Sequence, residues 1–321
     1  MAAGVLLVLV LASIASLFVG PYDPNEQLDP YSGRYRPPFT TLQVIRLDNG
    51  TTRLAEGTKI LEDQLHWTTR GRQDFVPLER VQNLENGSLQ EERFFLMGSD
   101  KLGRDVFSRW LHGARISLMV ASLVVLLATL IGLVVGTLAA LGPRWLDTLL
   151  MRFADGLLAF PWIFLIITLA TLFPSSIRTL VLLLGTTTWM GVSRLVRADI
   201  QSLLQRDFVL AARTLGADPL RVFLRHLLPN LLPTLLVAAP LRIGSVILSE
   251  ASLSFLGMGI QPPESSWGNM IADGREATFY AWWVPTFPAI ALVATMLSLN
   301  LLSDGIRDWW DPRASMEARA S

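Results

Sequence analysis

The residue types that most often carry out chemistry are few in this chain and lie far apart. It contains no cysteine, which excludes thiolate catalysis, disulfides and cysteine-ligated metal sites. No His-Glu-x-x-His pattern includes any of the three histidines, His66, His112 and His226, so a helical zinc-protease site is excluded. Neither lysine, Lys59 or Lys101, is followed by the Ser or Thr of a P-loop. We therefore predict no catalytic residue, no metal site and no P-loop ATP site on this chain.

Charged residues inside apolar stretches are also rare. Asp155 and Glu250 are expected at the ends of such stretches, whereas a proton-coupled transporter usually needs a carboxylate within the membrane, and this disfavours secondary transport. Arg242 is the exception, because it lies inside an apolar stretch, where a charge costs a few kcal/mol. We expect Arg242 to face protein or a wet cavity. Lining a translocation pathway and pairing with another residue are both open to it.

The most informative segment is a basic stretch between two apolar ones, residues 207–230, called the knob below. Its first part is helix-forming, and Gly216 suits the left-handed position that follows a helix end. Asp218 can cap a second helix, with Pro219 at its first position. We expect the second helix to continue until Pro229 bends the chain. The knob is therefore predicted to be two short helices that meet at a glycine.

The residues of the knob allow two interpretations. Ala211 and Ala212 present a small surface that lets a partner protein approach closely, and arginines such as Arg221 can reach carboxylates on that partner. Alternatively, the same helices lie on anionic lipid with their arginines facing water.

The elements that must position this knob are dominated by apolar stretches. Apolar residues make up 51% of the 321 residues and the mean hydropathy is +0.42, which is too apolar for an ordinary soluble domain. Because 27 basic residues balance 27 acidic ones, no bulk charge attracts nucleic acid. A membrane-crossing helix needs about 20 mostly apolar residues. Six stretches are predicted to be such helices: 3–19, 116–141, 157–173, 180–196, 231–248 and 283–302.

Arginine placement predicts the orientation of these helices. Arginines gather in the loops after the second and fourth stretches and in the tail, at Arg144, Arg152, Arg194, Arg197, Arg206, Arg213, Arg221, Arg225, Arg307, Arg313 and Arg319. The short loops on the other side hold only Arg178 and Arg275. The positive-inside rule therefore places the knob and both termini in the cytoplasm. The first stretch also has features of a cleaved signal peptide, but it lacks a basic start, so we predict a retained anchor.

About ninety polar residues separate the first two stretches and are predicted to lie outside. Residues 41–47 alternate towards Asn49-Gly50, and residues 51–55 follow, which predicts a β-hairpin. Asn86-Gly87 predicts a second turn. Both Asn-Gly pairs also match glycosylation sequons, to which we give little weight because a turn already accounts for them. The residues do not indicate what this insert does.

The knob and three further blocks resemble a known family. The pattern Ala211-Ala212-x3-Gly216-x11-Leu228-Pro229 resembles the EAA loop of ABC-importer permeases, the element that docks on the ATPase subunit. The blocks resemble the C-type permease subunit of dipeptide, oligopeptide and nickel importers of the bacterial inner membrane. They start at Gly98-Ser-Asp-Lys-Leu-Gly-Arg-Asp, Glu250-Ala-Ser-Leu-Ser-Phe-Leu-Gly and Asn300-Leu-Leu-Ser-Asp-Gly-Ile-Arg.

The resemblance implies a fold class and a division of the chain. The fold is expected to be an all-α polytopic membrane protein with six transmembrane helices and the type I ABC-importer permease fold. A small mixed α/β extracytoplasmic insert is expected between helices 1 and 2. The divisions are an anchor helix at 1–19, the insert at 20–98, a permease core at 99–313 with a coupling loop at 194–230, and a tail at 314–321.

The resemblance also implies a function, partners and site residues. The chain is expected to form half of the pathway of an ATP-driven peptide importer and to be no enzyme. Its expected partners are a B-type permease, two ABC ATPase subunits that bind ATP and Mg, an extracytoplasmic substrate-binding protein and the lipid bilayer, but no nucleic acid. The coupling residues would be Asp207, Leu210, Ala211, Ala212, Gly216, Ala217, Asp218, Arg221, Leu228 and Pro229, and Arg242 is a candidate pathway residue.

The chain departs from the family pattern at two places. Leu210 stands where the family's first EAA residue is acidic, and Asp207 stands where many relatives have Glu, which puts one ATPase contact in doubt. The insert is longer than in typical relatives. Transport of nickel complexes, glutathione or oligosaccharides is the alternative within the family. A self-contained channel, a secondary transporter and an intramembrane enzyme are the alternatives outside it.

Overall fold

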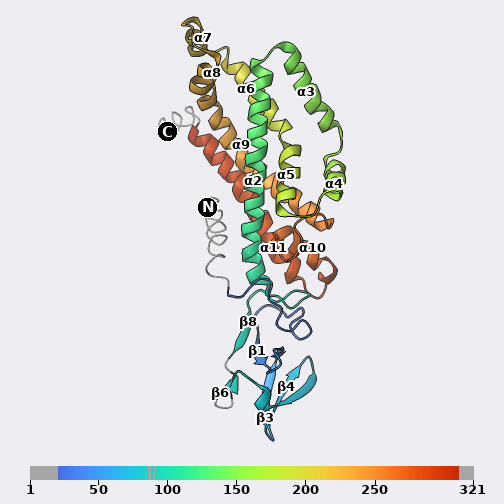
Figure 1. Ribbon diagram of the computed structural model, residues 1–321. Helices are drawn as coiled ribbons and strands as arrows, with labels where there is room; N and C mark the ends of the chain where they lie inside the picture. Colours follow the sequence, from blue (N-terminus) through green and yellow to red (C-terminus); the bar gives the residue numbers. More distant parts are fainter. Residues whose placement is uncertain (1–20, 86–87, 90, 311–321) are drawn as a thin grey trace.

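The computed structural model describes residues 21–85, 88–89 and 91–310, which form a helical body with a β-rich part at one end (Figure 1). Three long helices frame the body: α2 (Val106–Leu141), α9 (Leu228–Phe255) and α11 (Trp283–Trp310). At 1.5 Å per residue, the 36 residues of α2 extend about 54 Å, well beyond the roughly 30 Å of a bilayer core. Within the described residues, these three helices are long and apolar enough to cross a membrane.

Two of the expected spans are broken by a bend. Inside 157–173, α3 (Arg144–Ala159) gives way to α4 (Trp162–Leu172) with a bend of 89°. Pro161 has no N–H with which to continue α3, and it holds Phe160 in an extended conformation, with φ −79° and ψ 136°. Inside 180–196, α5 (Ile177–Thr188) and α6 (Met190–Leu203) meet at a bend of 42°.

The bend between α5 and α6 follows three consecutive threonines. The hydroxyls of Thr186, Thr187 and Thr188 each donate a 2.7 Å hydrogen bond to the carbonyl four residues earlier. Such side-chain bonds compete with the helix ladder and often bend a helix. If each bent pair is one span, the described residues hold up to five spans. The first predicted span, 3–19, lies outside them, so the count of six stays a prediction.

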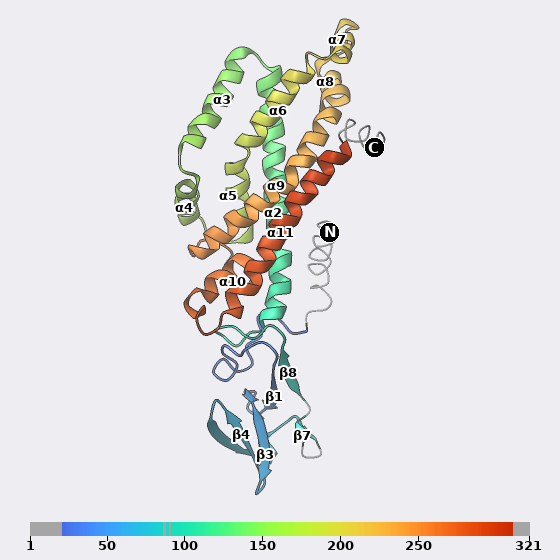
Figure 2. The same cartoon turned by 180° about the vertical axis from the view of Figure 1, so that it is seen from behind.

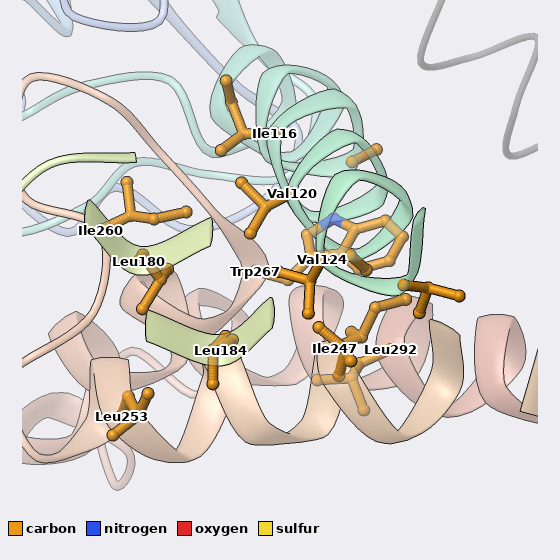
Figure 3. Close-up of a cluster of buried hydrophobic side chains, with 14 of the residues drawn as sticks. Ile116, Val120, Val124, Leu180, Leu184, Ile247, Leu253, Ile260, Trp267 and Leu292 are labelled. Atoms are coloured by element: carbon orange, nitrogen blue, oxygen red, sulfur yellow. The ribbon is translucent and has the colours of Figure 1, made fainter. Parts of the chain in front are cut away.

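The core of the helical body lies where α2 crosses its neighbours. Ile116, Val120 and Val124 of α2 point towards residues of α5, α9 and α11 (Figure 3). The indole of Trp267, from α10 (Trp267–Gly274), is fully buried there and donates a hydrogen bond to the carbonyl of Trp110. This packing fixes α10 against the end of α2.

Close approach of α2 to α6 depends on two glycines one helical turn apart. A Cβ on Gly132 would lie 2.5 Å from Cβ of Val192, and one on Gly136 would lie 2.5 Å from the carbonyl oxygen of Ser193. Small residues spaced by four are typical of helices that pack closely in membranes, where contact area rather than water exclusion stabilises association. The two glycines therefore allow this part of α2 to contact α6 closely.

The insert consists of antiparallel strands, not of the mixed α/β structure expected. Two sheets of three strands have the orders β2-β1-β8 and β3-β4-β5, and β6 pairs with β7. The only helical turn among its described residues is the three-residue 3-10 turn η1 (Leu78–Arg80). The strands are β1 (Thr40–Arg46), β2 (Thr52–Ala55), β3 (Gly57–Leu61), β4 (Gln64–Thr69), β5 (Arg72–Pro77), β6 (Leu84–Glu85), β7 (Ser88–Leu89) and β8 (Glu92–Phe95).

The hairpin expected at Asn49-Gly50 joins β1 to β2, and Gly50 has φ +77°. The Asn86-Gly87 pair, expected to form a second turn, lies outside the described residues. Sequence alternation was thus enough to place the first hairpin, because one face of β1 is buried, with Leu42 and Val44 nearly inaccessible.

A buried ion cluster ties the start of α2, next to the insert, to α10. Asp100 accepts from Nε of Arg104 at 2.7 Å and from Nη1 of Arg109 at 2.9 Å. Asp273, in α10, accepts from Nζ of Lys101 at 2.7 Å and lies 3.5 Å from Arg109. Because both arginines and Asp100 are almost fully buried, these partners satisfy one another and position α10.

The insert and the knob lie at opposite ends of the molecule (Figures 1 and 2). We call these the insert end and the knob end. The long helices α2, α9 and α11 run between them.

Candidate functional site

The knob contains two helices that meet at a tight elbow. The first is α7 (Asp207–Thr214), and the second is α8 (Pro219–Val222), which continues through the π-helical turn η2 (Phe223–Leu227) into α9. Asp207 is the first residue of α7 and is exposed, so its charge faces the helix N-terminus favourably.

Gly216 forms the elbow, as predicted. It has φ +79°, and its N–H donates to the carbonyl of Arg213 at 3.0 Å. The N–H of Ala217 donates to the carbonyl of Ala212 at 3.1 Å. These two bonds form a Schellman motif, which satisfies the last carbonyls of α7 and needs a residue tolerant of positive φ at its centre. The reversal of the chain is therefore encoded locally.

The cap of the second helix is also where the sequence predicted it. Asp218 accepts a 3.1 Å hydrogen bond from the N–H of Leu220, and Pro219 follows as the first helical residue. The expected bend at Pro229 is wrong, because Pro219–Phe255 forms one helical run. The π turn widens the helix just before Leu228 and Pro229, which lie in the first turn of α9.

Apolar side chains lock the base of the knob to the helical body. Val209 of α7, Val222 of α8 and Leu227 of η2 are almost fully buried. They pack in one cluster with Val196 and Ile200 of α6 and with Leu231 of α9. The ring of His226 also lies 6.3 Å from that of Phe208. A force applied to the knob is therefore transmitted to α6 and α9.

The tip of the knob presents apolar side chains to the surroundings. Leu215, at the elbow, is 87% exposed, and Leu220 of α8 is 64% exposed. Leu210 is half-exposed, Ala211 is exposed and Ala212 is half-buried on α7. Sequence reasoning missed Leu215 and Leu220, because leucines beside a helix end are as often core as surface. The available signal was the turn predicted at Gly216, which leaves Leu215 at the C-cap of α7, facing outwards.

Basic side chains surround this apolar tip. Arg213, Arg221 and Arg225 are exposed, and none of them forms an ion pair within the described residues. By contrast, Arg197 of α6 donates twice to Asp147 of α3, at 2.6 Å, and Arg194 pairs with Asp155. The knob therefore offers unpaired cations around an apolar tip, whereas the arginines of α6 hold α3 in place.

Arg242 lies in α9, far along the helix from the knob, and the structure does not bring it near the other candidate residues. Its guanidinium lies beside Gly191 of α6, where a Cβ would be 3.3 Å from Nη2. Of the two interpretations left open by the sequence, pairing finds no partner among the described residues, since Arg242 forms no ion pair there.

Glu250 is placed differently from expectation. It is inside α9 rather than at the end of a span, and it is 2% exposed. One carboxylate oxygen accepts from the hydroxyls of Ser254, at 2.7 Å, and Ser266, at 2.8 Å. Ser266 is the N-cap of α10, so Glu250 links α9 to that helix. Sequence reasoning missed this link because Ser266 lies 16 residues further along the chain, beyond the reach of any local pattern.

Comparisons with known proteins agree with this architecture. The family described as "Binding-protein-dependent transport system inner membrane component" matches residues 116–316. A "Putative peptide transport system permease protein" of Brucella abortus is 42% identical over 222 residues, which cover 69% of this chain and 75% of that protein. The "Di/tripeptide transport system permease protein DppC" of Pseudomonas aeruginosa is 38% identical over 219 residues, which cover 68% and 72%.

Among solved structures, an inward-facing MetNI methionine ABC transporter has a similar fold, with a TM-score of 0.51 and 17% sequence identity. The match covers 62% of this chain and 95% of that one. The helical body thus has the type I importer permease fold, to which the β-rich insert is added. Because the family match takes in more than half of the residues, the chain belongs to the binding-protein-dependent transport system inner membrane components.

Proposed function

We propose that this chain is the transmembrane permease subunit of an ATP-driven importer for peptides. The relatives that support the peptide assignment are named as peptide permeases and are 38–42% identical over about two thirds of the chain. The chain would supply half of the translocation pathway and no catalytic group, while ATP and Mg would bind to separate ATPase subunits. Nickel complexes, glutathione and oligosaccharides are the alternative substrates within the family.

The assembly we propose places the knob in the cytoplasm and the insert outside, with both termini inside. The arginine-rich loops at the knob end support this orientation through the positive-inside rule. A B-type permease would complete the pathway, two ABC ATPase subunits would contact the two knobs, and a substrate-binding protein would deliver peptide at the insert end.

The observation that carries the coupling proposal is a rigid knob with an exposed apolar tip. Leu215 is 87% exposed, yet Val209 and Val222 beneath it are buried against α6 and α9. The tip fits an apolar hollow on an ATPase, and Arg213 and Arg221 can reach acidic residues around that hollow. Closure of the ATPase dimer would then move α6 and α9 together. ATP shifts the conformational equilibrium only through its different affinities for the two states.

An arginine at the tip tests coupling directly. In proteoliposomes containing the whole importer and its binding protein, we expect Ala211→Arg to lower ATP-dependent peptide uptake roughly tenfold or more, the effect of about 1.4 kcal/mol of lost docking energy. Co-purification of the partner permease should be unchanged, since Ala211 is exposed. The ATPase activity stimulated by the binding protein should fall with uptake.

Glu79→Arg is the matched control, because it adds an arginine at an exposed site of the insert. Its uptake should equal that of the wild type. Uptake by Ala211→Arg at the wild-type rate would refute coupling through the knob. Uptake that continues without ATP would favour a channel or a secondary transporter, and a stable chain with no co-purifying ATPase would favour those or an enzyme.

A further inference from the structure

Arg242 is a cation without an acceptor in the helical body. It is half-buried in α9 and forms no hydrogen bond or ion pair with any described residue. The arginines of α6 differ, because Arg194 and Arg197 each have an aspartate of α3. A guanidinium carries five N–H donors, and leaving them unmet inside a membrane costs several kcal/mol. An acceptor must therefore come from outside the described residues.

The surroundings of Arg242 leave room for that acceptor. The guanidinium lies beside Gly191 of α6, two residues after the bend at Trp189. Gly191 is exposed, and its missing side chain lets the guanidinium lie against the backbone of α6. The site therefore has a cation between α6 and α9, and Gly191 has no side chain that would cover it.

Three serines continue the same face of α9 towards the insert end. Ser245, Ser249 and Ser252 follow Arg242 by 3, 7 and 10 residues, so they lie within one side of the helix over about 15 Å. Their hydroxyls donate to the carbonyls of Leu241, Ser245 and Leu248, at 3.0, 2.8 and 2.8 Å. With their hydrogens used, the hydroxyl oxygens are left as acceptors for N–H groups.

This polar face points away from the core of the protein. On the opposite side of α9, Ile247 is buried in the main apolar cluster, and Val246 and Leu253 are buried between that side and the polar face. Bare lipid is a poor neighbour for Arg242, because its N–H donors would lack partners there. A polar solute with both donors and acceptors matches the face better.

We infer that Arg242 binds the terminal carboxylate of a peptide during passage, while the serine face accepts hydrogen bonds from its N–H groups. This inference rests on the proposed function as a peptide permease. Charge complementarity selects this occupant, since a guanidinium binds a carboxylate through two parallel N–H···O bonds. The acceptors on the three serines suit the peptide N–H groups that precede the carboxylate.

A pair of peptides that differ only at the carboxyl end tests the inference. The probe is one tripeptide prepared as the free acid and as the C-terminal amide, whose affinities for the isolated binding protein are measured first. Uptake of each is then followed in proteoliposomes holding the whole importer, with binding protein saturated by either peptide. The quantity compared is the ratio of acid uptake to amide uptake. Because every variant uses the same binding protein, a difference in this ratio between variants comes from the permease and not from the selectivity of the binding protein.

We expect Arg242→Gln to lower this ratio roughly tenfold, the size expected for losing a charge-assisted hydrogen bond. Arg242→Lys, which keeps the charge but loses the paired geometry, should recover part of the ratio. Arg152→Gln is the matched control: Arg152 is exposed on α3 and has no ion pair within the described residues, so the ratio should equal that of the wild type.

Three outcomes would overturn the inference. They are an unchanged ratio in Arg242→Gln, an equal loss of uptake for both peptides, and loss of the partner permease from the purified complex, which would mean that Arg242 pairs with that subunit. The proposed function is judged separately by Ala211→Arg, which should stop uptake of both peptides. If Ala211→Arg transports normally, coupling fails; if only the ratio is unaffected by Arg242→Gln, the carboxylate site alone fails.

Discussion

Single residues at the knob elbow carry most of what could be predicted about the site. Gly216 and Asp218 were predictable because a Schellman turn and an N-cap depend on neighbours only a few positions away. The exposure of Leu215 and the burial of Glu250 were not predictable, since each depends on packing against segments distant in the sequence. Arg242 was singled out from its span, but its lack of a partner needed the fold.

The backbone of Gly216 gives a prediction at this scale. Gly216→Ala should destabilise the knob by about 1–2 kcal/mol, because φ +79° is costly for any residue with a Cβ although no atom lies within 4 Å of that Cβ. The cost should appear as faster hydrogen exchange at the amides of Gly216 and Ala217, whose bonds close the turn. Weaker stimulation of the ATPase should accompany it.

Gly156→Ala provides the comparison for Gly216→Ala. Gly156 lies within α3, also has no atom within 4 Å of a built Cβ and does not have a positive φ. There alanine should leave exchange unchanged or slow it slightly, by the higher helix propensity of alanine. If both variants exchange alike, backbone strain at the elbow is not what shapes the knob.

At the scale of whole helices, length and apolarity were readable, but continuity was not. The sequence located the long helices because a run of about 20 apolar residues matches the length that a helix needs to cross a bilayer. It missed the 89° bend at Pro161, where a loop and a new helix fit inside one apolar stretch. The sequence also predicted a bend at Pro229, but the helix continues through this residue after the π turn that precedes it. Proline marks a possible interruption, and only the neighbouring helices decide whether one occurs.

The contact between α2 and α6 gives the second prediction. Gly136→Leu should destabilise the protein by roughly 1–3 kcal/mol, because the added side chain meets the carbonyl of Ser193, a backbone atom that cannot move without shifting α6. We expect a lower midpoint of thermal unfolding for the purified importer. Since α6 leads into the knob, stimulation of the ATPase should fall too.

Gly305→Leu isolates the effect of position for that variant. Gly305 is in α11 and has open space around a built Cβ, so a leucine there should change the free energy of unfolding by no more than about 0.5 kcal/mol and leave the midpoint near that of the wild type. Equal losses at both positions would mean that added bulk, not the contact with α6, causes the result.

At the scale of the molecule, long helices join two ends that differ in their secondary structure and in the side chains they present. The knob end has exposed arginines and an apolar tip. The insert end has strands (Figure 1) and buried ion pairs. The insert's first hairpin was predictable from alternation, whereas its full set of strands was not, because the short strands β6 and β7 carry too few residues for a pattern. The absence of an α-helix among its described residues corrects the expected α/β character.

The last prediction concerns how acid affects the insert relative to the helical body. The hydrogen bond from Arg36 is the largest cause that lowers the pKa of Glu56 below its ordinary value; partial burial opposes it, and a hydrogen bond from the backbone N–H of Arg70 lowers the pKa further. A carboxylate whose pKa is lower in the folded state contributes stability above its unfolded pKa, about 4.3, and loses it as the pH falls through the folded pKa. Strands β2 to β4 should therefore open more readily below about pH 4.

Hydrogen exchange of the full chain, corrected for the intrinsic effect of pH, should show this opening in the wild type and much less of it in Glu56→Gln. Glu79→Gln, at an exposed site of the same insert, should keep the wild-type response. An identical response in all three proteins would show that Arg36 and Glu56 do not couple the insert to pH.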